Sequence, residues 1–169
     1  TFSDSKTRWA VGFYNFLVKS VDGGKTWQNF VVDPAISDQV LWSCVCFRNP
    51  QLGCIVGGNC VYKTTDGGNT WSSVLDIPVT GVIYVPSSVY FVSDTKGFIC
   101  SHNGTLMRTL DGGVTWHNQH LDSFTTLDLY SVTFFDDNNG WVVGYNGILF
   151  GTTDGGDHWS LLHSPADPA

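Results

Sequence analysis

The sequence contains no glutamate, so all fifteen acidic residues in this chain of 169 residues are aspartates. Any active site that depends on a glutamate is therefore excluded. Basic residues are also scarce: there are only eight lysines and arginines, and the formal net charge is −7. Because a nucleic-acid groove needs cations along one face to displace counterions, we expect no nucleic-acid partner.

Long apolar runs are missing as well. None approaches the roughly 18–20 residues that a membrane helix needs, and we expect a soluble chain without membrane insertion. The sequence is instead rich in turn formers and aromatic residues, with 19 glycines and seven tryptophans. Since apolar stripes with helical spacing are few, these residues favour an all-β domain with frequent tight turns.

One eight-residue segment occurs four times at a nearly constant spacing. Each copy has a serine or threonine, then Asp-Gly-Gly two residues later, and ends in a tryptophan. The aspartates are Asp22, Asp66, Asp111 and Asp154, and the tryptophans are Trp27, Trp71, Trp116 and Trp159. Asp before Gly-Gly indicates a hairpin turn, because glycine enters positive φ without a Cβ clash. We expect the aspartate to lock the turn and the tryptophan to pack across it, with a looser fourth turn where His158 replaces threonine.

Each repeat also has apolar segments before this turn. The matching segments are residues 8–12, 53–57, 97–101 and 140–144, with apolar strands at 42–47, 88–92 and 130–135 before the last three. Four short antiparallel strands in each repeat predict a β-propeller blade. The chain is thus predicted to be one all-β propeller domain, residues 1–169, of four four-stranded antiparallel blades. The repeats lie near 1–40, 41–84, 85–127 and 128–163, with a C-terminal tail at 164–169.

Three arrangements of these blades remain open: a four-bladed ring, half of a ring completed by a second copy, or part of a larger propeller. The sequence begins at Thr1 without an initiator methionine or a signal peptide. We expect either that a targeting segment has been removed or that the chain is a fragment.

The segment from Gly140 to Trp159 resembles the repeat of the photosystem II stability and assembly factor propellers. The short turn alone, known as the aspartate box or bacterial neuraminidase repeat, also resembles that of sialidases and sortilin-type receptors. The resemblance implies a non-enzymatic propeller that binds proteins in a thylakoid lumen or in another location outside the cytosol. We therefore expect an assembly factor or accessory subunit of a larger, photosynthetic complex, with a protein partner and no cofactor.

Two alternatives to this function follow from the same box. A sialidase-like site resembles three arginines that grip a carboxylate beside a Tyr–Glu pair, and this chain has Arg8, Arg48 and Arg108 but no glutamate. A secreted carbohydrate-binding module is the stronger alternative, with Tyr14, Tyr145 and tryptophans stacking on sugars. We expect no metal site, because one aspartate followed by two glycines supplies too few oxygen ligands for calcium.

Three basic residues stand at one position of the repeat, three residues before the aspartate. They are Lys19, Lys63 and Arg108, and Gly151 stands there in the fourth copy. Since a repeat places equivalent side chains on one rim, these cations are candidates for docking an acidic partner segment. The alternative is three solvated side chains that flank a turn.

Five cysteines and one glycosylation sequon complete the candidate sites. Cys54 and Cys60 flank a Gly-Gly-Asn turn, and we predict a disulfide between them, although Cys54 also stands where other repeats have plain core residues. Zinc is less favoured, because the spacings are not of the paired Cys-x-x-Cys type. Asn103, in an Asn-Gly-Thr triplet, is a candidate for glycosylation in a secretory location.

Overall fold

The computed structural model describes residues 1, 3–34, 40–74, 85–121 and 126–163, which form four antiparallel sheets. Blade 1 contains β1 (Arg8–Val11), β2 (Leu17–Ser20) and β3 (Gln28–Phe30). Blade 2 contains β4 (Trp42–Phe47), β5 (Gly53–Gly57), β6 (Cys60–Thr64) and β7 (Ser72–Ser73). Blade 3 contains β8 (Pro86–Phe91), β9 (Gly97–Ser101), β10 (Leu106–Thr109) and β11 (His117–Asn118). Blade 4 contains β12 (Leu129–Phe134), β13 (Gly140–Gly144), the 3-10 turn η1 (Tyr145–Gly147), β14 (Leu149–Thr152) and β15 (Ser160–His163).

Each sheet is a meander of consecutive strands, and its order in space follows the chain. The sequence therefore predicted the fold class correctly. Blade 1 has three strands, and Thr1 exchanges two hydrogen bonds with Trp9 at the position that the first strand occupies in the other blades. The predicted tail at residues 164–169 lies outside the described residues.

The core lies between the blades. The second strands β5 and β9 are buried along their whole length, because both of their faces are covered by neighbouring sheets. Three clusters of buried side chains join blades 1 and 2, blades 2 and 3, and blades 3 and 4. Aromatic rings bridge two of these interfaces, where Trp9 stacks on Phe47 at 5.4 Å and Phe98 stacks on Phe134 at 5.2 Å between ring centroids.

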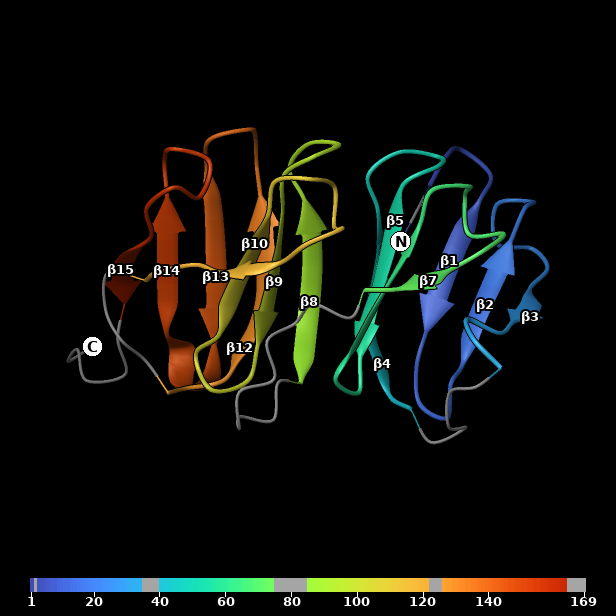
Figure 1. Ribbon diagram of the computed structural model, residues 1–169, viewed down its shortest axis with the longest axis horizontal. Helices are drawn as coiled ribbons and strands as arrows, with labels where there is room; N and C mark the ends of the chain where they lie inside the picture. Colours follow the sequence, from blue (N-terminus) through green and yellow to red (C-terminus); the bar gives the residue numbers. More distant parts are fainter. Residues whose placement is uncertain (2, 35–39, 75–84, 122–125, 164–169) are drawn as a thin grey trace.

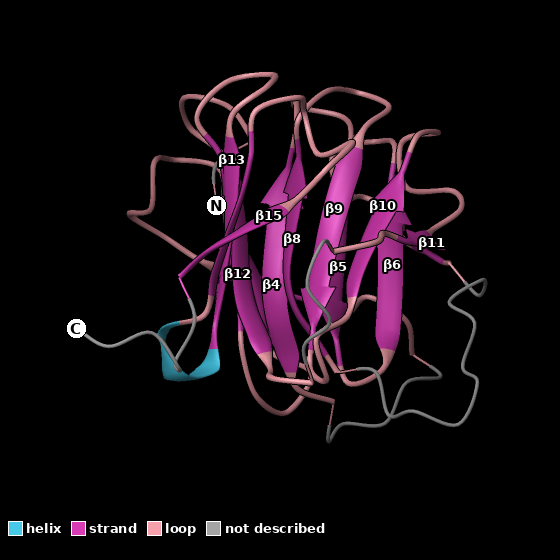
Figure 2. Ribbon diagram, turned by 90° about the vertical axis from the view of Figure 1, so that its left-hand side faces the viewer, coloured by secondary structure: helices cyan, strands magenta, loops and turns pink. Residues whose placement is uncertain are grey.

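The four blades stand in an open row rather than a closed four-bladed ring. Blade 1 and blade 4 lie at opposite ends of this row in Figure 1, and no cluster of buried residues in the described part of the chain joins them. Seen from the blade 4 end, successive sheets stand behind one another, and η1 lies at the lower edge (Figure 2). Within the described residues, no helix is long and apolar enough to cross a membrane.

The predicted disulfide between Cys54 and Cys60 is wrong. The two-residue turn after Gly57 pairs Gly57 with Cys60, so Cys54 lies opposite Lys63 and three residue pairs from the turn. All five cysteines are free thiols. Cys54 and Cys100 are fully buried in the interfaces, as expected of plain core cysteines. Burial raises the pKa of the Cys100 thiol to about 12, so this side chain is unreactive.

Candidate functional site: the aspartate-box rim

The four aspartate boxes lie in the turn before the last strand of each blade, and we number them as boxes 1 to 4. Box 2 shows their common geometry. The buried Thr64 hydroxyl donates to Asp66 Oδ1 at 2.8 Å and accepts from the Gly68 N–H at 2.8 Å. Asp66 also accepts from the backbone N–H of Thr70 at 2.9 Å and from its hydroxyl at 2.6 Å. The carboxylate thus closes the turn from both sides, as predicted.

The hydrogen bonds in the box change the acidity of its carboxylate. The bond from the Thr70 hydroxyl and then that from the Thr70 N–H lower the pKa of Asp66 to about 2. The pKa values of Asp22 and Asp154 are lowered as well, first through Thr26 and His158 respectively. These aspartates accept hydrogen bonds and are held in the ionised form, whereas a general acid must be protonated before it can donate a proton.

Box 4 is not the looser turn that the sequence predicted. The His158 N–H donates to Asp154 Oδ1 at 3.0 Å, and its ring atom Nδ1 lies 2.7 Å from Oδ2. The imidazole therefore occupies the place of the threonine hydroxyl in the other boxes, and Asp154 also accepts from the Thr152 hydroxyl at 2.8 Å.

Each box is also tied to the first turn of its own blade. The N–H of the first glycine donates to a carbonyl there, for example from Gly67 to Gln51 at 3.0 Å and from Gly155 to Asn138 at 2.8 Å. This bond needs the glycine at positive φ, and φ is 71° at both Gly67 and Gly155. The boxes accordingly fasten two turns along one edge of the row.

The repeated basic residues reach across to the box of the next blade. Lys19 Nζ donates to Gly67 O in box 2 at 3.2 Å, and it lies 4.9 Å from the Trp9 ring centroid. Arg108 donates to Asp157 in box 4 at 2.6 Å and lies 3.5 Å from Gly156 O. Lys63 extends toward Gly112 in box 3. We call these contacts the cationic clasps.

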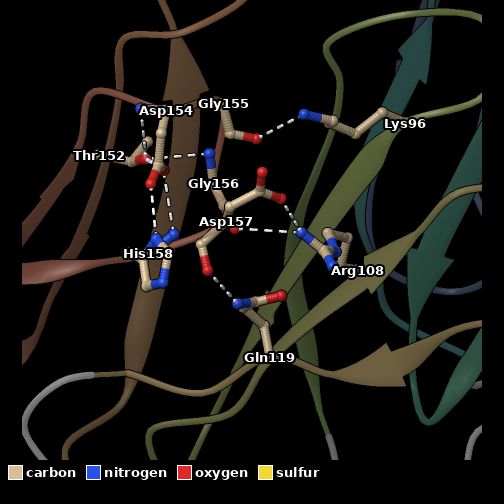
Figure 3. A network of polar contacts seen from close by, with 9 residues as sticks. All are labelled: Lys96, Arg108, Gln119, Thr152, Asp154, Gly155, Gly156, Asp157 and His158. Carbon is tan, nitrogen blue, oxygen red and sulfur yellow. Dashed lines mark hydrogen bonds and ion pairs between the residues drawn. The ribbon is translucent and has the colours of Figure 1, made fainter.

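Figure 3 shows the clasp between blades 3 and 4. Besides Arg108, Lys96 Nζ donates to Gly155 O at 3.0 Å and Gln119 Nε2 donates to Asp157 O at 3.1 Å. Three side chains of blade 3 thus hold the backbone and side chain of box 4. Sequence reasoning placed Lys19, Lys63 and Arg108 on one rim but missed that Lys19 and Arg108 bind the neighbouring blade.

The box tryptophans pack between blades as well as across their own hairpins. Trp159 is fully buried, with its ring centroid 5.7 Å from that of Phe98 in blade 3. Trp71 meets Trp9 of blade 1 at 6.0 Å. Trp27 of box 1 is 46% exposed, and its indole N–H donates to Gly24 O. The tryptophan of each box thus packs against the preceding blade wherever such a blade is present.

The other predicted residues lie apart from one another. Arg8 donates to Asp4 O and Arg48 lies 3.8 Å from Asp94, so neither converges with Arg108 on a common point. Asn103 is exposed on the turn between β9 and β10, where its φ is 55°. Among the described residues, no group of three or more His, Cys or Asp side chains is placed to hold a metal ion.

A hollow of about 360 Å³ adjoins box 3 on this rim. Arg108, the exposed Leu110 and the strand β11 line it, and Asp111 and Thr115 of the box form its edge. It therefore combines a cation, an apolar side chain and a short outer strand, which are the elements that bind an extended acidic peptide.

The repeated blades and their boxes define an aspartate-box β-propeller. Residues 1–82 and 74–167 match the family described as photosynthesis system II assembly factor YCF48. The chain belongs to this family. No curated protein matches the sequence.

Solved structures with this fold include the one described as YCF48 bound to D1 peptide. It has a TM-score of 0.65 and 17% identity over 95% of this chain and 78% of that chain. YCF48 from Cyanidioschyzon merolae has a TM-score of 0.74 and 20% identity, over 95% of this chain and 54% of that one. A GH74 enzyme from Niastella koreensis has a TM-score of 0.70 and 18% identity, over 94% of this chain and 28% of the enzyme. These likenesses show the shared fold.

Proposed function

We propose that the chain is a non-enzymatic propeller that binds a protein partner during assembly of photosystem II or a related multisubunit complex. The family match over residues 1–82 and 74–167 carries this proposal. Because one solved propeller of this fold holds a D1 peptide, we propose an extended peptide segment of a complex subunit as the partner. A location outside the cytosol, in a thylakoid lumen or secreted, is part of the same proposal.

The proposed contact is the hollow beside box 3. Arg108 lines this hollow, and its guanidinium forms an ion pair with Asp157, whose side chain is exposed. The Arg108 side chain is only 24% exposed and the Asp157 side chain is 59% exposed, so an acidic residue of the partner would compete with Asp157 for the guanidinium. Lys19 and Lys63 stay in the proposal as the other cations of this rim.

A catalytic role for the boxes has little physical support. Their carboxylates have lowered pKa values, as at Asp66, and each lies in a different blade. Glycoside hydrolysis requires two carboxyl groups that flank one bond, one of them protonated. The likeness to a GH74 enzyme therefore supports the fold and not the activity.

The carbohydrate-binding alternative requires Tyr14 and Tyr145 to share one stacking surface. Tyr14 follows β1 in blade 1 and Tyr145 lies in η1 of blade 4. These two exposed rings are at opposite ends of the row (Figure 1), so they do not form one stacking platform.

Titration of a fluorescent D1 peptide against the purified chain tests the proposal. Arg108→Ala should weaken binding about tenfold or more, because a charge-assisted hydrogen bond is lost. Asp157→Asn should strengthen it, since the competing carboxylate is removed. Arg48→Ala is the matched control, because Arg48 also faces an aspartate at 3.8 Å but lies outside the hollow. No binding of the peptide, or equal loss in Arg48→Ala, would contradict the proposal.

A further inference from the structure

The outer strands of blade 3 place a histidine opposite the arginine of the cationic clasp. Arg108 of β10 and His117 of β11 are direct partners in the antiparallel ladder, and residues directly opposite each other lie on one face of a sheet. Both side chains line the hollow of about 360 Å³ beside box 3. Blade 3 has a neighbouring blade on each side, so this hollow lies on an internal blade of the row (Figure 1).

The other three blades have the same cross-strand pair, with different residues. The partners are Lys19 and Gln28 in blade 1, Lys63 and Ser72 in blade 2, and Gly151 and Ser160 in blade 4. Of the four pairs, only that of blade 3 sets a side chain that titrates between about pH 5 and pH 8 opposite a cation. Since glutamine or serine takes the place of His117 elsewhere, the packing of a blade does not require a histidine there.

The box 3 side of His117 offers it little stabilisation as a cation. Its Nε2 atom lies 3.5 Å from the Thr115 hydroxyl, which donates to Asp111 at 2.7 Å. Asp111 also accepts from the Val114 N–H at 3.0 Å. The carboxylate of box 3 is thus already engaged in its own turn. Along the chain the next titratable side chain is His120, which is exposed and does not line the hollow.

The charged groups of box 4 also have other partners. Asp157 pairs with Arg108 at 2.6 Å, and Asp154 pairs with His158 at 2.7 Å (Figure 3). Among the residues that the structure describes, no carboxylate forms an ion pair with His117. Like charges directly opposite each other destabilise a sheet. Protonation of His117 beside Arg108 is therefore unfavourable until an anion lies between them.

We propose that Arg108 and protonated His117 together bind one carboxylate of an extended peptide in this hollow, and that His117 makes the binding tighter as the pH falls. This inference rests on the peptide partner proposed above and names a second residue that selects its acidic group. The carboxylate accepts a charge-assisted hydrogen bond from each cation. Binding of the peptide and binding of a proton at His117 then favour each other, because each is stabilised by the other's charge.

The pH range follows from the groups involved. Histidine gains its charge as the pH falls from about 8 to about 5, while an ordinary carboxyl group stays ionised above about pH 5. Arginine stays charged throughout. Arg108 therefore contributes to peptide affinity over the whole range, and His117 accounts for the increase in affinity between about pH 8 and pH 5.5.

Fluorescence anisotropy of a labelled D1 peptide, titrated at several values between about pH 8 and pH 5.5, tests this role. The dissociation constant should fall about threefold to tenfold over this range for the unmodified chain. His117→Gln should keep the affinity found at the highest pH and lose the increase, and glutamine fits because Gln28 holds this position in blade 1. His120→Gln is the matched control and should keep the increase, since His120 is exposed but lies outside the hollow.

A fixed charge and a blocked peptide end extend the test. His117→Lys should bind tightly already at the highest pH and change little on acidification, because lysine stays charged over this range. A C-terminal amide on the peptide distinguishes the two sources of a carboxylate. Loss of the pH dependence with the amide assigns the terminal carboxylate to the two cations, and its retention assigns a side-chain carboxylate.

The role of His117 and the proposed partner can fail separately. If the peptide binds and Arg108→Ala weakens it, but the dissociation constant is the same at every pH, the partner stands and the role of His117 is wrong. The role is also wrong if His120→Gln removes the pH dependence as fully as His117→Gln does. If no peptide binds at any pH, both the partner and this inference are wrong.

Discussion

At the scale of single residues, the buried hydroxyl at the start of each box is expected to stabilise the turn. Thr64 is buried and bonds both Asp66 and the Gly68 N–H, whereas its neighbour Thr65 is exposed. Thr64→Ala leaves a buried N–H without its acceptor, which costs about 1–3 kcal/mol. Thr65→Ala should stay within about 0.5 kcal/mol of the parent. Urea unfolding of the two variants checks the difference, and equal midpoints would refute the role of the hydroxyl.

The box carboxylates also predict acid sensitivity. The pKa of Asp66 in the folded state is lowered from 3.8 to about 2. A carboxyl group whose pKa is lower in the folded state stabilises the fold above its unfolded pKa and loses that contribution as pH falls through the folded value. Asp22 and Asp154 shift in the same direction. We therefore expect the urea midpoint to be level above about pH 5 and to fall steadily between about pH 4 and pH 2.

A shallower decline in Asp66→Asn than in the unmodified chain would assign part of this acid sensitivity to box 2. If the urea midpoint does not change between about pH 5 and pH 2, the boxes do not hold their carboxylates in the ionised form.

At the scale of elements, the second glycine of each box belongs to the contact between blades. A Cβ at Gly156 would overlap the Phe98 ring of blade 3, whereas at Gly24 its nearest neighbour would be Trp27 of the same box, at 3.6 Å. Both glycines have positive φ, 85° and 93°. Alanine therefore costs about 1–2 kcal/mol at either position. Overpacking against Phe98 should add about 1–3 kcal/mol to the loss of stability in Gly156→Ala but not in Gly24→Ala. Thermal unfolding of the two variants measures that difference.

The strands were largely predictable, because the apolar segments repeat with the boxes. The prediction at residues 42–47 matches β4, while those at 88–92 and 130–135 miss the starts of β8 and β12. All three first strands, including β4, have an irregular register near their first residues, so this irregularity does not account for the two missed starts. The disulfide prediction failed because the register of β5 and β6 is regular and their turn is short, so counting pairs outward from Gly57 places Cys54 opposite Lys63.

The cationic clasps were beyond a local interpretation of the sequence. Lys19 and Arg108 each contact a glycine carbonyl 48 residues further along the chain. The residues that flank a surface lysine or arginine in the sequence do not indicate a binding partner so far along the chain. The regular spacing between each cation and the next box was the one available signal, and it becomes meaningful only when consecutive repeats are known to pack face to face.

At the scale of the whole molecule, the clusters of buried side chains among the described residues join each blade to its neighbours in the row, as in other repeat proteins. Stability is then approximately the sum of the blade terms and the terms for each interface. Removing one interface weakens the row locally, and the same substitution should have different effects at equivalent positions inside the row and at its end.

Phe98 and Trp141 provide that comparison, because they hold the same position in blades 3 and 4. Phe98 is buried against Phe134 and Trp159, so Phe98→Ala should cost about 3–5 kcal/mol. Trp141→Ala should cost much less in dilute solution, where the forward face of blade 4 meets solvent. Equal losses of stability in the two variants would refute the sum of neighbour terms. Urea unfolding of the two variants at one protein concentration measures the difference.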